Sequence, residues 1–192
     1  MTRSILTICT ILSALGYVAS THAADEHKHE NKPADIKDAV AVLVPMKSSG
    51  VAGAILLKQE KGLVNVSGEV TGLKPGKHGF HIHMFGDLRA PDGTSAGGHY
   101  NPHGHPHGSP EAGDHDRHEG DLGNIEANAQ GVAKVNVKAK GLELHHVLGR
   151  AIVVHADPDD FSQPVGNAGA RIALGVIGLA EVKAPAAAAK KK

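Results

Sequence analysis

The chain has 192 residues, and its 20 basic and 20 acidic side chains balance to a formal net charge of zero. This balance leaves no basic surface for nucleic acid, so we expect no nucleic-acid partner. Aromatic residues make up only 3% of the chain and tryptophan is absent, so the core must be built from Val, Ile, Leu and Ala. The 24 glycines indicate many turns and favour a β architecture.

The first residues have the pattern of an export signal. Arg3 supplies a short basic start, an apolar run extends over residues 5–18, and small residues follow. A transmembrane anchor is disfavoured because this run is shorter than the roughly 20 apolar residues that a span needs. We expect residues 1–23 to be a signal peptide, so that the mature protein is exported to the periplasm or the extracellular space without membrane attachment. The only cysteine is Cys9, so the mature chain would have none.

Two polar or low-complexity segments flank the expected domain at residues 38–182. Residues 24–37 form a polar leader that contains His27 and His29, and its composition predicts flexibility. Residues 183–192 form an Ala/Lys tail that we expect to be disordered.

Strand-like segments follow one another at short intervals through this domain. Several alternate apolar with polar or small residues at period two, which is typical of strands with one buried face. Turns rich in Gly and Pro separate them, and no segment has a convincing amphipathic-helix pattern. Seven or eight strands in an all-β sandwich or barrel are therefore expected. The segments are 39–46, 51–59, 63–70, 79–85, 131–138, 149–155 and 170–179.

Two long connections, 86–121 and 156–168, interrupt the strands, and long loops on a rigid β scaffold often carry function. Nine of the fifteen histidines lie between residues 78 and 121. Because this stretch is rich in Gly and Pro, it cannot be mostly helical. A bound metal ion is the obvious way to hold such a segment in a compact domain.

The histidines also have spacings that suit metal binding. His81 and His83 lie two residues apart on an expected strand, so both side chains leave the same face. Imidazole-rich sites suit copper and zinc, and a set of imidazoles with one aspartate suits zinc. The further candidate ligands are His99, His107, His118, Asp121 and His155.

Seven short motifs carry a specific resemblance. They are GFHIH at 79–83, FGD at 85–87, TSAGGHYNP at 94–102, HEGDLGN at 118–124, GVA at 131–133, GRAIVVHA at 149–156 and GNAGARIALGVIG at 166–178. In order and approximate spacing, residues 40–180 resemble the copper/zinc superoxide dismutase family. The resemblance implies an eight-stranded Greek-key β-barrel or sandwich with a long metal-binding loop and a short second active-site loop. It also implies an antioxidant enzyme that converts two superoxide anions to oxygen and hydrogen peroxide by alternating Cu(II)/Cu(I) redox, with a structural zinc.

The resemblance assigns the ligands residue by residue. His99 would bridge the two ions, and it would also take up and pass on a proton in the reaction. His103 and His105 compete with His107, which is preferred because its distance from His99 and its His-Gly-x-Pro turn match the family; His103, His105 and His115 are then expected to be exposed. The implied copper ligands are His81, His83, His99 and His155, and the implied zinc ligands are His99, His107, His118 and Asp121.

Two further residues receive roles from the same resemblance. Asp159 stands where the family has a carboxylate that hydrogen-bonds one copper histidine and one zinc histidine, which would fix the orientation of both rings. Arg171 matches the arginine that lines the copper channel and attracts superoxide, and a guanidinium is always charged.

The chain departs from the family in two ways. The usual disulfide cannot form, because the corresponding positions are Gly93 and Leu174. The second long loop is short and its charges are acidic, so attraction of superoxide would depend more heavily on Arg171. The missing disulfide also puts the family's dimer in doubt, so either a monomer or a homodimer is expected.

One alternative from another functional class remains open. Extra histidines at 27, 29, 103, 105, 145 and 146 would also suit a non-catalytic exported protein that buffers copper and zinc. Arg171 argues against it, since metal storage needs no arginine that guides an anion.

Overall fold

The computed structural model describes residues 36–181. The predicted signal peptide, all but two residues of the predicted leader, and the predicted Ala/Lys tail lie outside the described residues. No helix within residues 36–181 is long and apolar enough to cross a membrane.

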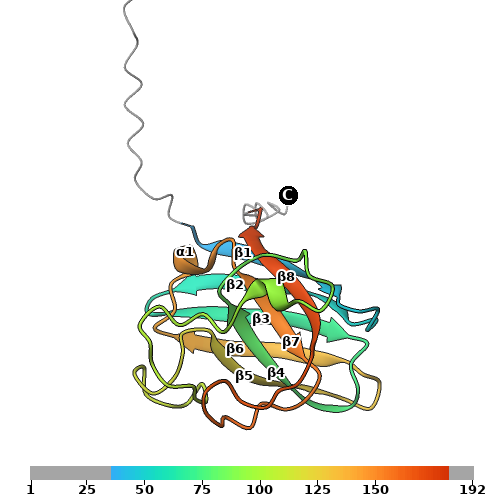
Figure 1. Ribbon diagram of the computed structural model, residues 1–192. Coiled ribbons are helices and arrows are strands. Elements are labelled where there is room, and N and C mark those ends of the chain that lie inside the picture. The colour runs from blue at the N-terminus through green and yellow to red at the C-terminus, as the bar shows by residue number, and fades with distance from the viewer. Residues whose placement is uncertain (1–35, 182–192) are drawn as a thin grey trace, which may run out of the picture. The chain divides into compact units, whose positions relative to one another are not determined.

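Eight antiparallel strands close into a barrel in the order β1-β2-β3-β6-β5-β4-β7-β8 (Figure 1). After the consecutive strands β4, β5 and β6, the chain returns so that β7 lies beside β4, which is a Greek-key connection. The strands are β1 Asp38–Pro45, β2 Ala52–Glu60, β3 Leu63–Thr71, β4 Gly76–His83, β5 Asp121–Ala127, β6 Ala133–Lys140, β7 Ala151–His155 and β8 Arg171–Leu179. The all-β, eight-stranded Greek-key prediction is thereby confirmed.

Period-two alternation explains how the barrel is filled. On β3, Val64, Val66 and Val70 are fully buried in the barrel core, while the residues between them are more exposed. Because aromatic residues are scarce, Phe80 is the only fully buried aromatic side chain in the described part of the core, and aliphatic residues fill the rest. The core therefore depends on many small branched side chains that pack closely.

The structure adds three elements that sequence patterning did not predict as such. β5 begins at Asp121, at the end of the long connection, and its register with β4 shifts between Gly79 and His81. A single helical turn, α1, spans Leu144–Val147, and a short 3-10 turn spans Thr94–Ala96. Both turns are too short to show the periodicity by which a helix is predicted.

A second, smaller apolar cluster lies on the outer face of β7 and β8. Leu174 is completely buried there, whereas its strand neighbours Ala173 and Ile177 belong to the barrel core. A Cβ atom added to Gly93 would lie only 2.9 Å from Cδ1 of Leu174, so the two positions that lack the family cysteines are in contact. The cluster consists of Met46, Ala96, Ala151, Val153 and Leu174, with Leu88 packed against it.

Leu174→Ala is expected to destabilise the protein by about 2–5 kcal/mol, because it opens a cavity where the long loop meets the barrel wall. Urea denaturation of the metal-loaded protein measures this change. Val176→Ala is the matched control on the same strand, since Val176 is 38% exposed and should cost about 1 kcal/mol or less. Equal losses of unfolding free energy in the two variants would contradict the role of Leu174 in packing the long loop against the barrel wall.

Candidate metal centre

Strand β4 presents two histidines on the outer face of the barrel. Phe80 and Ile82 point into the core, so the alternating residues His81 and His83 leave the opposite face. Both imidazoles are nonetheless buried, with relative exposures of 0% and 1%. The long connections after β4 and β7 cross this face (Figure 1). The histidine side chains therefore extend from a rigid strand into a space that these loops cover.

A first group of four imidazoles converges at this point. Single nitrogens of His81, His83, His99 and His155 all lie within 4.8 Å of one another. The Nδ1 of His83 donates to the carbonyl of Gly97 at 2.8 Å, and the Nδ1 of His155 donates to the carbonyl of Gly169 at 3.2 Å. These bonds fix both tautomers and leave the two Nε2 lone pairs facing each other at 3.4 Å.

A second group shares His99 with the first and centres on the buried carboxylate of Asp121. One nitrogen of each of His99, His107 and His118 and one oxygen of Asp121 lie within 4.8 Å of one another. The carboxylate lies 2.9 Å from Nδ1 of both His99 and His107, and 3.2 Å from Nδ1 of His118. It also accepts hydrogen bonds from the backbone N–H groups of Gly108 and His118. Three imidazoles and one carboxylate form the donor set that zinc prefers.

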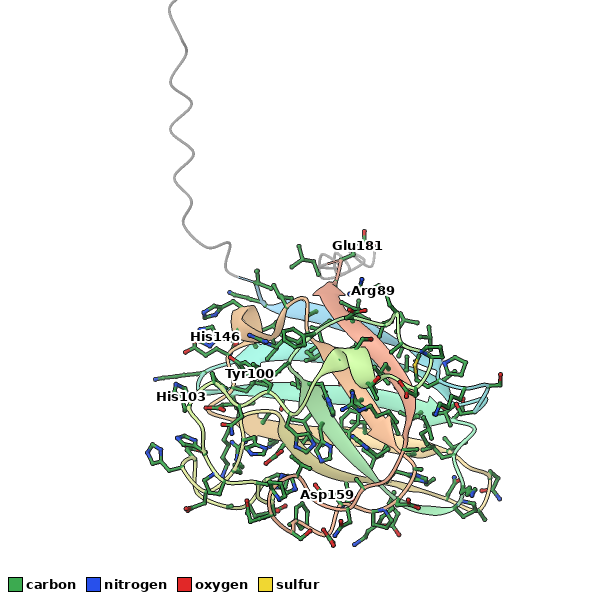
Figure 2. All side chains as sticks on the ribbon, viewed as in Figure 1. Arg89, Tyr100, His103, His146, Asp159 and Glu181 are labelled. Atoms are coloured by element: carbon green, nitrogen blue, oxygen red, sulfur yellow. The ribbon has the colours of Figure 1, made fainter. Side chains whose placement is uncertain are left out.

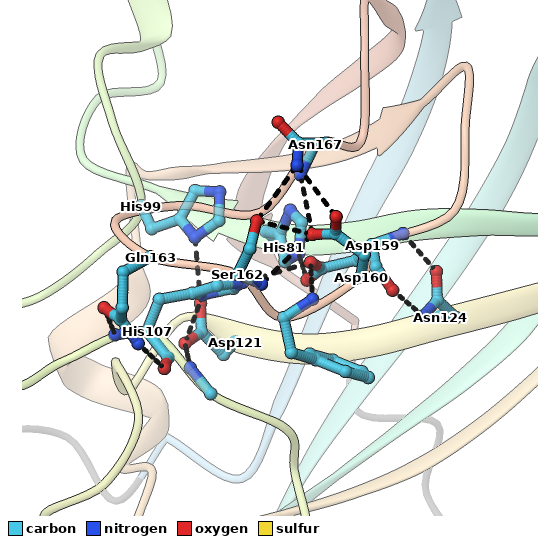
Figure 3. A network of polar contacts seen from close by, with 12 residues as sticks. His81, His99, His107, Asp121, Asn124, Asp159, Asp160, Ser162, Gln163 and Asn167 are labelled. Carbon is cyan, nitrogen blue, oxygen red and sulfur yellow. Dashed lines mark hydrogen bonds and ion pairs between the residues drawn. The ribbon is translucent and has the colours of Figure 1, made fainter.

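Asp159 joins the two groups (Figure 3). Its Oδ2 accepts a hydrogen bond from Nε2 of His81 at 2.8 Å, and its Oδ1 accepts one from Nε2 of His107 at 3.1 Å. Asn124 on β5 holds the backbone of Asp159 through two hydrogen bonds of 2.8 and 2.9 Å. A side chain at Gly166 would overlap the Asp159 carboxylate, since its Cβ would lie 2.0 Å from Oδ1.

Burial and hydrogen bonding set the charge states of these groups. Burial lowers the pKa of His99 to about 4, that of His155 to about 3, and that of His83 well below its usual value. These imidazoles are therefore neutral near pH 7, which is the form that binds metals. Burial opposes ionisation of Asp121, but hydrogen bonds from the surrounding histidines outweigh it and hold its pKa far below the usual range.

His107 behaves differently from the other imidazoles. Burial disfavours its protonation, but its hydrogen bonds with Asp121 and Asp159 outweigh that effect and raise its pKa to about 9. Both ring nitrogens donate to carboxylates when the imidazole is charged. A metal cation at Nδ1 would replace a proton there, while the bond from Nε2 to Asp159 would persist.

Arg171 lies beside the first group at the start of β8. A pocket of about 190 Å³ is lined by His83, His99 and His155 together with the guanidinium-bearing side chain of Arg171. The guanidinium donates to the carbonyl of Gly93 and, at 2.6 Å, to the carbonyl of Gly97. Because the carbonyl of Gly97 also accepts the bond from His83, a single peptide group sets the position of the arginine relative to that imidazole.

The residues present fit a pair of metal ions. The Nδ1 atom of His81 is buried and has no hydrogen-bond partner among residues 36–181, although it belongs to the first imidazole group. An unpartnered buried nitrogen is costly, and a metal ion would satisfy it. The donor chemistry fits copper in the group of four imidazoles and zinc in the group with the carboxylate.

The structure brings together every site residue predicted from the sequence, and it adds some that were not predicted. His103 and His115 are exposed as expected, but His105 is partly buried. Sequence reasoning missed Asn124, although it ends one of the motifs quoted above. It also missed Gln163, whose side-chain amide makes two hydrogen bonds with the backbone of His107. No local pattern marks Gln163, because its partner lies 56 residues away.

The structure is a closed Greek-key barrel with two adjoining groups of buried imidazole and carboxylate side chains that can bind metal ions. This combination defines the class of β-barrel metalloproteins. The family model of copper/zinc superoxide dismutase (SODC) matches residues 51–177. The extracellular superoxide dismutase (Cu-Zn) of Onchocerca volvulus is 42% identical over 180 residues, which cover 86% of this chain and 88% of that relative. The crystal structure of the clock protein EA4 is similar with a TM-score of 0.68 and 38% identity, over 76% of this chain and 96% of that chain. The chain belongs to the copper/zinc superoxide dismutase family.

Proposed function

We propose that this protein is a superoxide dismutase that converts two superoxide anions and two protons to oxygen and hydrogen peroxide. The observation that carries the proposal is the shared pocket of three imidazoles and Arg171. A fixed cation beside a redox-metal site is what a small anionic substrate requires. Family membership supports the same reaction.

The proposed ligands follow from the two groups. Copper would be held by His81, His83, His99 and His155, and zinc by His99, His107, His118 and Asp121. When bound, copper supplies the one-electron oxidation and reduction of superoxide, and zinc supplies structural support.

His99 is the residue common to both sets. Its Nδ1 faces Asp121 at 2.9 Å and His118 at 3.4 Å, which leaves Nε2 for the copper group. An imidazole in this position can take up a proton at Nε2 and pass it to reduced substrate. We therefore propose His99 and Arg171 as the residues that act directly on the substrate.

The Arg171 guanidinium would bind and orient the anion before electron transfer. Its two carbonyl contacts use part of its donor set and hold the group rigid, while its remaining N–H donors have no partner within residues 36–181 and can bind the substrate. The backbone of the long loop thus orients the arginine, and the arginine orients superoxide.

Arg171→Ala is expected to lower the dismutation rate about tenfold to a hundredfold at low salt, because it removes the fixed charge that guides the anion. The rate is measured by pulse radiolysis on protein with verified copper and zinc content. Arg89→Ala is the matched control, since the Arg89 side chain is 90% exposed and, among residues 36–181, forms an ion pair only with Asp87 in the same loop. If both variants kept the wild-type rate, Arg171 would have no role in guiding superoxide.

The same assay separates catalysis from the alternative of a non-catalytic copper/zinc buffer. A buffer with full metal occupancy would show negligible dismutation, and Arg171→Ala would change nothing. Neither the family match nor the relatives favour that alternative. Arg171 also has no purpose in metal storage, so the enzyme is the function that the geometry supports.

We further propose export to the periplasm or the extracellular space, followed by action as a monomer or homodimer. The relative from Onchocerca volvulus is named as extracellular, and residues 1–23 have the pattern of a signal peptide. N-terminal sequencing of the secreted protein tests the cleavage site, and sedimentation velocity tests the oligomeric state.

A further inference from the structure

A third group of potential metal donors lies outside the metal centre. One ligand atom from each of Glu143, His145 and His146 lies within 4.8 Å of the other two, which is the closeness that also defines the two buried groups. The three residues belong to the turn α1 and the position before it, ahead of β7. Figure 2 labels His146 at the upper left of the barrel, whereas Asp159 of the metal centre is labelled at the bottom. The proposed function uses none of these three side chains.

The backbone of this turn is held in place by the barrel. Leu144 and Val147 are fully buried and belong to the barrel core. The backbone N–H of Leu144 donates to Oε1 of Gln59 on β2 at 2.7 Å, and the carbonyl of His146 accepts from Nε of Arg150 at 2.8 Å. A single helical turn is not stable alone, so these contacts fix it. The two exposed imidazoles of the turn are therefore presented from a preorganised backbone.

The three donor side chains already face one another. The ring centroids of His145 and His146 lie 4.0 Å apart, with an angle of 57° between the ring planes. Nδ1 of His145 lies 3.4 Å from Oε2 of Glu143. Glu143 is the N-cap residue of α1, but its side chain makes no capping hydrogen bond, so the carboxylate is not committed to the helix end. An ion would find its donors gathered, and binding would therefore cost little side-chain entropy.

The donor set of this group differs from that of the buried zinc-type group in one respect. The group around Asp121 offers four protein donors, which complete the coordination of a tetrahedral ion. The surface group offers two imidazoles and one carboxylate, a set that zinc uses where its fourth position stays open. That position is left to water or to an external ligand. An ion held by three exposed donors is bound more weakly than one in the buried group, and it exchanges faster.

We propose that Glu143, His145 and His146 bind an exchangeable zinc ion on the surface turn, as a third ion beyond the two of the metal centre. The side chain of His145 is 49% exposed and that of Glu143 is 59% exposed, so zinc reaches and leaves the site without any opening of the barrel. The site shares no residue with the two buried groups or with the pocket of Arg171. The inference therefore does not depend on dismutation.

Two other exposed imidazoles supply the contrast for a test. His103 and His115 are exposed, but within residues 36–181 neither belongs to a group of three donors that could share an ion. H103A/H115A removes as many imidazoles as H145A/H146A does. It is therefore the matched control, because it separates a gathered set of donors from histidine content alone.

The test is isothermal titration calorimetry of zinc into the mature protein, with verified copper and zinc content and after removal of free metal. Every sample carries H27A/H29A, which keeps the histidines of the leader out of the measurement. This background is expected to bind one further zinc ion. Added H145A/H146A should weaken that binding at least about tenfold, because two of the three donors are lost. Metal analysis and the melting temperature before titration establish that the inner groups are intact.

Two further variants complete the comparison. H103A/H115A in the same background should bind the third zinc as tightly as the background itself. E143Q keeps the size of the Glu143 side chain but removes its negative charge, so it should weaken the third zinc without changing the melting temperature before titration. E143Q also replaces H145A/H146A if that variant loses inner metal.

Three outcomes would overturn the surface site. The H27A/H29A background could bind no zinc beyond the two inner ions. The further zinc could bind unchanged in H145A/H146A or, if that variant loses inner metal, in E143Q. It could also be lost in H103A/H115A as fully as in H145A/H146A, which would make exposed imidazoles in general, and not this turn, the ligands.

Discussion

Removal of both metals from the mature protein by a chelator is expected to lower its melting temperature by about 15 °C or more. An ion whose dissociation constant lies about a thousandfold below its free concentration adds about 4 kcal/mol to the stability of the folded state. For a domain of this size, each kcal/mol of stability shifts the melting temperature by about 2–4 °C. The structural reason is that many polar side chains are buried close together at the metal centre. Six imidazoles and two carboxylates are buried together, and Nδ1 of His81 is buried without a hydrogen-bond partner among residues 36–181, so a bound ion would satisfy it.

A reducing agent that binds metals weakly provides the control for chelation and should leave the melting temperature unchanged. The only cysteine, Cys9, lies in the predicted signal peptide, so the mature chain has no disulfide to reduce. Zinc added back alone should restore most of the loss, because the group around Asp121 fastens the long loop to β5. A melting temperature that held steady after complete metal removal, verified by metal analysis, would contradict the proposed structural role of the ions.

Asp159→Asn is expected to weaken zinc binding about tenfold to a hundredfold, since loss of a partner that orients a metal-binding histidine has effects of this size. The carboxylate accepts from Nε2 of both His81 and His107. An amide has only one accepting oxygen, so its NH₂ group would face one of the two N–H donors. Zinc affinity is measured by competition with a chromophoric chelator. Asp159 is a positioning residue here, because it touches neither the proposed ions nor the substrate.

Asp160→Asn is the matched control for this prediction. It removes the same charge from the next position in the same loop, but the Asp160 carboxylate contacts Ser162 and Asn167 rather than an imidazole (Figure 3). Its zinc affinity should stay within about twofold of wild type. Equal weakening in the two variants would mean that loop charge, and not the orientation of the imidazoles, controls zinc binding.

Most of the barrel could be predicted from the sequence because its strands carry a local signal. Alternation along β3 follows directly from the fact that successive side chains point to opposite faces. β5 was missed as a strand because Asp121 begins it, and the short segment Asp121–Ala127 has Gly, Asn and Glu between its apolar residues. Its strand conformation depends on pairing with β4 and β6, and pairing is a property of the assembled sheet.

The contact of Gly93 with Leu174 shows how a family feature can be replaced. Sequence comparison indicates only that two cysteines are missing. The structure shows that Leu174 fills the space at Gly93, whose φ of 74° lies in the left-handed region that favours glycine. Apolar packing therefore holds the loop against β8 at the point where the family uses a covalent bond.

The sequence by itself determined the class of chemistry, because residue types and short spacings carry it. The pair His81 and His83 on a strand, the Gly-rich turn before His99, and the motif around Arg171 all indicated a metal centre and an anion site. Only the tertiary structure decided which nitrogen of each imidazole is free, which peptide carbonyl orients Arg171, and how Gln163 and Asn124 support the centre. These depend on contacts between segments 35 to 78 residues apart. They are set by barrel closure and loop packing, which no local pattern encodes.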